Sequence, residues 1–156
     1  MMLEDLIFTC SHRILHTPWF YKRVHKWHHQ YTTSVGICAE YAHPLEFIIG
    51  NSLPFGIPCI LLGKRMHCFT YLVWGTYRIA NTVYGHSGYE FPWVFSDLLP
   101  FNSTTQYHDF HHSHNVGNYA GSFIIWDYVF NWNSDYFAFY EAKKHQEKRT
   151  KPVKTD

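Results

Sequence analysis

The pattern of apolar and polar positions predicts a helical chain that begins with two amphipathic helices. Apolar side chains recur at helical spacing over residues 3–16, and Pro18 ends this first helix. Residues 19–31 form a second predicted helix, in which aromatic and basic side chains are mixed. Aromatic rings at the headgroup level of a membrane, with basic residues toward the cytosol, are typical of an interfacial helix. A solvated basic helix of a soluble protein is the alternative.

Two strongly apolar runs follow, over residues 47–63 and 66–77, with a basic pair between them. The first run has no charged residue, but Pro54 and Pro58 interrupt it, and its length is at the lower limit for a membrane-spanning helix. The second run is shorter. We expect the two runs to form a hairpin that enters a membrane and returns, either by two crossings or as a re-entrant loop. A buried hairpin of a soluble protein is the alternative.

Three groups of histidines flank this hairpin. The segment HRILH has two histidines one helical turn apart, and the segments HKWHH and HDFHH each have histidines at i, i+3 and i+4. On an α-helix these spacings place the side chains on one face. The eight histidines of these groups are His12, His16, His25, His28, His29, His108, His111 and His112. Such repeated spacing indicates a metal site rather than isolated polar residues.

Eight imidazoles exceed the four ligands that one tetrahedral ion needs, so they indicate two ions close together. Imidazole binds iron, copper, zinc and nickel, and no cysteines have the CxxC spacing of a structural zinc site, so the residues alone leave the metal open. His86, in HSGYE after the second apolar run, is a possible ninth ligand. The other histidines are expected to be structural or to support the ligands: His43, His67, His114 and His145.

Composition narrows the class of protein further. The chain has 156 residues, the length of one domain, and 20% of them are aromatic, which argues against disorder. The formal net charge is only +1, so we expect no nucleic-acid partner. Acidic residues near the N-terminus argue against a cleavable secretory signal. The sequence has no glycine-rich dinucleotide fingerprint and no P-loop, so a metal centre that reduced dioxygen while oxidising a C–H bond would have to take its electrons from a redox partner.

Three further expectations concern the remaining residues. Residues 117–132 are predicted to form a helix that packs against the site as part of an aromatic core. Residues 141–156 are expected to be a basic cytosolic tail, solvated and partly disordered. The single, scattered cysteines are predicted to be buried reduced thiols in a reducing compartment: Cys10, Cys38, Cys59 and Cys68.

The order HRILH, HKWHH, apolar hairpin and HDFHH resembles the fatty acid hydroxylase/sterol desaturase superfamily of membrane non-haem di-iron oxygenases. The segments EDLIFTCSHRILH, AEYAHPLE, HSGYEFP and GNYAGSFIIWD look most like its C-4 methylsterol monooxygenase branch. The similarity runs from about Glu4 to Tyr140, so residues 1–140 are expected to be a fatty acid hydroxylase-like domain. Members of the superfamily usually have further apolar spans before the first histidine group, and we expect these spans to be missing from this chain.

The resemblance implies an all-α integral membrane fold in which a cytosolic, histidine-rich helical cap holds two iron ions at the endoplasmic reticulum membrane. The implied ligands are the eight histidines above and His86. The implied reaction is oxidation of the 4α-methyl group of a sterol by O2, with electrons from NADH through cytochrome b5 and NADH-cytochrome b5 reductase. No catalytic side chain is expected beyond the ligands. Thr82 stands where distant members have another histidine, and Asn131 stands where a glycine is common.

Other functions stay open on the sequence. One is a different activity of the superfamily, such as that of a sterol desaturase or a fatty acid hydroxylase. Another is a truncated, non-catalytic paralogue that keeps the histidines for metal binding or for the stability of the fold. A third is a soluble zinc protein, which would leave the apolar hairpin without a role.

Overall fold

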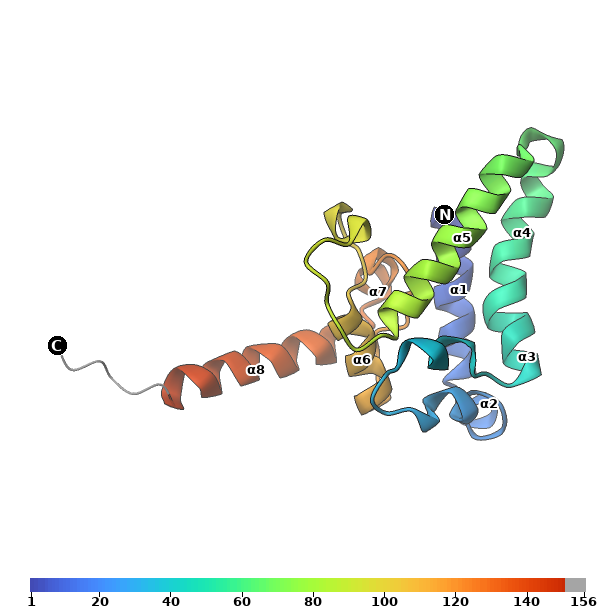
Figure 1. Cartoon of the computed structure of the whole chain (residues 1–156). Coiled ribbons are helices and arrows are strands. Elements are labelled where there is room, and N and C mark those ends of the chain that lie inside the picture. Colours follow the sequence, from blue (N-terminus) through green and yellow to red (C-terminus); the bar gives the residue numbers. More distant parts are fainter. Residues whose placement is uncertain (151–156) are drawn as a thin grey trace.

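The computed structural model describes residues 1–150, and this part of the chain is helical without strands, as the sequence predicts (Figure 1). An isolated bridge between Asn102 and Phe123 is the β-type pairing found among these residues. The main helices are α1 (Met2–Leu15), α2 (Pro18–Arg23), α3 (Pro44–Glu46), α4 (Leu53–Leu62), α5 (Cys68–Gly85), α6 (Thr105–His114), α7 (Ile125–Phe130) and α8 (Ser134–Thr150). Shorter turns join them: η1 (His25–Gln30), η2 (Gly36–Glu40), the π-helical η3 (Phe47–Ser52), η4 (Gly63–Arg65) and η5 (Phe95–Leu98).

The predicted apolar hairpin is present, with longer limbs than the hydrophobic runs indicate. Its first limb is a continuous helical stretch of 22 residues, Pro44–Arg65, which is long and apolar enough to cross a membrane. The second limb, α5, continues to Gly85, and α1 packs against the first limb (Figure 1). Polar side chains near the end of α5 form hydrogen bonds or ion pairs with other parts of the fold. Arg78 of α5, for example, forms an ion pair with Glu4 of α1.

The single helix predicted over residues 19–31 is wrong, because the chain breaks at Val24. The backbone of Val24 has φ −125° and ψ −67°, which ends α2, and the HKWHH segment then forms the 3₁₀ turn η1. Val24 is 3% exposed, and the three histidines that follow are buried. Burial of these side chains against the rest of the fold therefore outweighs the local preference for a continuous helix.

The helix predicted over residues 117–132 is also wrong for most of its length, since only α7 is helical. The preceding loop is held by two buried carboxylates. Asp127 accepts hydrogen bonds from the backbone N–H groups of residues 119 and 120, and Asp5 accepts them from those of residues 122 and 123. These N–H groups would be the donors of a helix, and the carboxylates bind them instead. Asn131 ends α7 with φ +55°, a left-handed conformation that asparagine tolerates better than most residues.

The C-terminal segment is more ordered than predicted. Residues up to Thr150 continue the helix α8, which extends away from the body of the protein (Figure 1). Residues 151–156, the rest of the predicted tail, lie outside the described residues. The four cysteines are free thiols, but only Cys38 is buried, and Cys68 is exposed. The prediction of four buried cysteines is therefore wrong, because Cys68 lies in the first turn of α5 at the exposed tip of the hairpin.

Candidate metal centre

The structure brings the nine predicted histidines together in two groups. Within each group, the nearest ring nitrogens lie within 4.8 Å of one another. Eight of the nine side chains are buried and His16 is half-buried. The first group contains His12, His16, His25, His29 and His111. The second group contains His28, His86, His108 and His112.

Each HxxHH segment supplies both groups. In HKWHH, the i and i+4 residues His25 and His29 belong to the first group, whereas His28 belongs to the second. In HDFHH the arrangement is reversed, since the i+3 residue His111 belongs to the first group. The two groups therefore face each other. The rings of His29 and His112, one from each group, stack with their centroids 4.5 Å apart.

Backbone carbonyls fix the orientation of five rings through Nδ1. A carbonyl oxygen only accepts a hydrogen bond, so Nδ1 carries the proton and Nε2 keeps its lone pair. Metal-binding histidines typically have this arrangement. Nδ1 donates to the carbonyl oxygen in each of these five pairs: His12 and Tyr119 (2.8 Å), His28 and Tyr41 (3.3 Å), His86 and Thr82 (2.8 Å), His111 and Gly117 (2.6 Å), and His112 and Tyr31 (3.1 Å).

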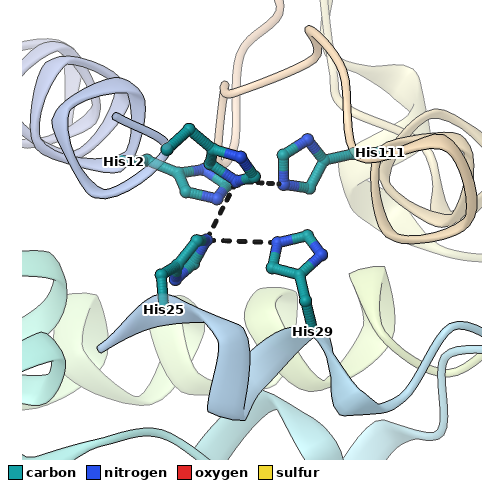
Figure 2. Close-up of side chains that lie close together, drawn as sticks. His12, His25, His29 and His111 are labelled. Carbon is teal, nitrogen blue, oxygen red and sulfur yellow. Dashed lines mark hydrogen bonds between the residues drawn. The ribbon is translucent and has the colours of Figure 1, made fainter. Parts of the chain in front are cut away.

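The Nε2 atoms within each group face one another at 2.9–3.2 Å. Figure 2 shows rings of the first group, which point to a common centre from α1, η1 and α6. His28 and His86 of the second group show most clearly that two lone pairs face each other. Both rings donate a hydrogen bond through Nδ1, so both Nε2 atoms keep a lone pair, and these two atoms lie 3.2 Å apart. Two lone pairs this close repel each other unless a cation binds both.

The spacing of the Nε2 atoms also bears on the geometry of such a cation. With metal–nitrogen bonds of about 2.1 Å, two ligands at a right angle lie about 3.0 Å apart, and two tetrahedral ligands lie about 3.4 Å apart. The shortest observed contact, 2.9 Å, is close to the first value, and the longest, 3.2 Å, lies midway between the two. The five nitrogens of the first group also exceed a tetrahedral set. The first group therefore offers more ligands than tetrahedral zinc takes and fits an ion of higher coordination number, whereas the four nitrogens of the second group equal a tetrahedral set.

Burial keeps these imidazoles neutral. Desolvation lowers the pKa of His12 and of His28 to about 4, and the pKa of His86 to about 3. It places the pKa values of His108 and His111 well below their usual range. At neutral pH these imidazoles are therefore uncharged, and the Nε2 atoms of the five rings that donate through Nδ1 are available to a cation.

Glu46 is a functional residue that pattern reasoning missed. Its Oε1 accepts a hydrogen bond from Nδ1 of His25 over 2.8 Å, and both side chains are buried. Its other oxygen, Oε2, is buried without a hydrogen-bond partner among the described residues. A carboxylate behind a ligating imidazole fixes the ring and makes it a stronger donor to a metal. The one signal in the sequence was the position of Glu46 in the AEYAHPLE segment.

Three of the remaining histidines have structural contacts, as expected. Nδ1 of His43 accepts a hydrogen bond at the start of α3, and Nδ1 of His67 does the same at the start of α5. The ring of His114 stacks on Phe110 with centroids 4.1 Å apart. His145 lies exposed on α8.

A small cavity of about 40 Å³ lies between the histidines and the apolar hairpin. Five of the histidines line it, from both groups. Its other walls include Phe8 of α1, Asn51 of η3 and Thr82 of α5. Bound ions would thus face a confined, mostly apolar space on the side of the hairpin.

The chain belongs to the fatty acid hydroxylase family, whose model matches residues 1–132. The family to which the histidine pattern pointed is therefore confirmed. No solved structure gives a significant match.

Curated relatives of two kinds match most of the chain. A methylsterol monooxygenase of Aspergillus fumigatus is 45% identical over 82% of this chain and 44% of its own length. A putative methylsterol monooxygenase of Dictyostelium discoideum is 42% identical over 91% of this chain and 52% of its own. A very-long-chain aldehyde decarbonylase of Oryza sativa is 42% identical over 86% of this chain and 51% of its own. The chain thus spans about half the length of these relatives. The sequence identities of the methylsterol monooxygenases and of the aldehyde decarbonylase to this chain are similar.

Proposed function

We propose that this protein is a membrane di-iron oxygenase that oxidises the 4α-methyl group of sterols. The observation that carries the proposal is the pair of facing imidazole groups, within which Nε2 atoms converge at 2.9–3.2 Å. The nine histidines would be the ligands, five for one iron and four for the other. The relatives named methylsterol monooxygenase support the sterol as substrate.

The chain's own residues would bind, orient and shield the two ions. The nine imidazoles bind them, and the Nδ1 hydrogen bonds hold five of the rings in place. Iron bound there supplies activation of O2 for oxidation of a C–H bond. The small cavity beside His86 and His108 would confine the methyl group next to the ions and keep bulk water away. No side chain has to act as a base.

Location and electron supply follow from the same proposal. The helical stretch Pro44–Arg65 and the exposed apolar side chains of the hairpin, such as Ile60 and Phe69, support insertion in a membrane. We propose the endoplasmic reticulum as the membrane, as the resemblance of the sequence implies. The metal centre would face the cytosol, because the basic residues of α2 would then lie on the cytosolic side. Electrons would come from NADH through cytochrome b5 and its reductase, since the sequence has no dinucleotide fingerprint.

A second candidate is a reaction on a long-chain aldehyde. The rice aldehyde decarbonylases match 86% of this chain at 42% identity, which is close to the value for the methylsterol monooxygenases. Sterol desaturase or fatty acid hydroxylase activity is a broader alternative within the superfamily. A non-catalytic paralogue would keep the ions and lack turnover.

Metal stoichiometry and turnover, measured on one preparation, test the proposal. The protein is purified in detergent, its metals are counted, and it is supplied with NADH, cytochrome b5, its reductase and O2. We expect about two irons per chain and oxidation of 4,4-dimethylsterol but not of a very-long-chain aldehyde. Consumption of the aldehyde alone would favour the second candidate. Two irons without any turnover would favour the non-catalytic paralogue, and a single zinc would contradict the metal assignment.

A further inference from the structure

A second, larger cavity leads toward the metal centre from the hairpin. It has a volume of about 320 Å³ and lies between the η3 and α4 limb and α5. Phe47, Phe55 and Ile79 make much of its wall apolar, and Asn51 and Arg78 are among its polar residues. Asn51 also lines the cavity of about 40 Å³ beside the histidines. Asn51 therefore lies where an apolar cavity meets the metal centre.

The orientation of the Asn51 amide is fixed by its neighbours. Nη2 of Arg78 donates a hydrogen bond to Oδ1 of Asn51 over 3.0 Å, and Nε of Arg78 donates to Oε1 of Glu4 over 2.7 Å. The Arg78 and Glu4 side chains are only 15% and 8% exposed. A guanidinium has donors and no acceptor, so the amide oxygen must face Arg78. The NH2 group of Asn51 then points away from Arg78, and no partner for it is found among the described residues.

The local backbone at Asn51 is unusual as well. Asn51 belongs to the π-helical turn η3, and π-helical turns inside helices occur frequently at functional sites. Glu46, which supports His25, immediately precedes the same turn. One short segment therefore supports a metal ligand and presents an oriented amide to both cavities.

We propose that Asn51, oriented by Arg78 and Glu4, donates a hydrogen bond to the oxygen on carbon 3 of a sterol and so determines substrate specificity. This inference rests on the proposed function. In a 3-hydroxy-4-methylsterol the oxygen and the reacting methyl group are on neighbouring ring carbons. A residue that recognises the oxygen must therefore lie beside the metal centre, as Asn51 does. The rest of the sterol would occupy the larger apolar cavity.

Equilibrium binding tests the inference without turnover. The probes are a labelled 4,4-dimethyl-3-ketosteroid, whose ketone can only accept a hydrogen bond, and its 3-deoxy counterpart. The key variant is Asn51→Asp, which has nearly the same shape and still accepts from Arg78 but has no amide donor. Ser52→Ala is the matched control, because Ser52 lines the same cavity and its hydroxyl already donates to the Phe47 carbonyl. Iron content is measured for every protein.

We expect the native protein and Ser52→Ala to bind the ketosteroid about tenfold more tightly than the deoxy steroid, as one neutral hydrogen bond allows. Asn51→Asp should lose this preference, bind the deoxy steroid as the native protein does and keep its iron. An unchanged preference in Asn51→Asp, or no preference in the native protein, would overturn the inference. If the native protein bound neither steroid, the sterol substrate itself would be wrong, and the role of Asn51 would fall with it.

Discussion

Nδ1 of His25 donates a hydrogen bond to Oε1 of Glu46 over 2.8 Å, and this carboxylate distinguishes the first histidine group from the second. The rings of His12 and His111, in the same group, are held by backbone carbonyls. The three fixed rings of the second group are also held by carbonyls. A carboxylate withdraws the Nδ1 proton more strongly than a carbonyl does, so His25 should be the strongest donor to a metal in the centre.

Replacing the Glu46 carboxyl group with an amide should therefore weaken one ion more than the other. We expect Glu46→Gln to lower the metal affinity of the first group by about 10- to 100-fold. Metal retained during dialysis against a chelator series measures this affinity. Glu40→Gln makes the same chemical change on an exposed residue and should keep the native affinity. Equal loss of both ions in Glu46→Gln would contradict the asymmetry.

Removing one ligand from each group tests the division of the histidines. His111→Ala should lower the metal content through the first group, and His28→Ala through the second. Each variant should abolish oxidation, because two ions act together in the proposed reaction. His145→Ala, on the exposed face of α8, is the control. Native metal content in both ligand variants would show that the centre is assigned to the wrong residues.

The sequence allowed the clustering of eight histidines to be predicted because their spacing repeats. The i, i+3 and i+4 pattern is local information, and it identified three segments whose histidines the fold brings together. It could not predict how the segments divide between two groups. That division depends on the break at Val24 and on the way η1 faces α6, both of which are set by tertiary contacts.

The supporting residues were harder to predict for the same reason. Asp5 and Asp127 look like ordinary acidic residues of predicted helices, but they hold a loop by its backbone N–H groups. That loop supplies the Tyr119 carbonyl to which His12 donates. The contacts of Asp5 and His12 with this loop join residues more than a hundred positions apart, and such contacts leave no periodic signal in a single sequence. Glu46 and Asn51 likewise gain their roles only from the packing of the hairpin against the centre.

The stability of the metal-free protein should depend steeply on pH. Burial lowers the pKa of His12 and of His28 from 6.5 to about 4, so the unfolded chain takes up protons in this range that the folded protein does not. The free energy of unfolding therefore has its full value above pH 6.5 and decreases as the pH falls toward 4. Each such histidine contributes up to about 1.4 kcal/mol per pH unit.

Thermal unfolding of the chelator-treated protein in detergent, from above pH 7 downward, measures this dependence. The melting temperature should fall most steeply below pH 6.5. The His145→Ala variant should give the same profile, because its altered residue is exposed on α8. A melting temperature that stayed level down to pH 5 would show that the histidines are not buried and neutral in the folded protein.

Gly117 joins a left-handed turn to the histidine groups. Its backbone has φ +56°, and a Cβ there would lie 2.3 Å from the backbone oxygen of Trp132. The carbonyl of Gly117 accepts the 2.6 Å hydrogen bond from Nδ1 of His111. Gly117→Ala should therefore displace this carbonyl, lower the free energy of unfolding by about 2 kcal/mol or more, and reduce the metal content of the first group.

Calorimetric unfolding together with metal analysis checks this prediction. Gly56→Ala is a suitable control, because Gly56 lies in α4 and a Cβ there would meet nothing within 4 Å. Since alanine favours a helix more than glycine does, this control should be as stable as the native protein or slightly more stable, with its metal retained. If Gly117→Ala lost stability but kept both ions, the His111 ring would not depend on the Gly117 carbonyl for its orientation.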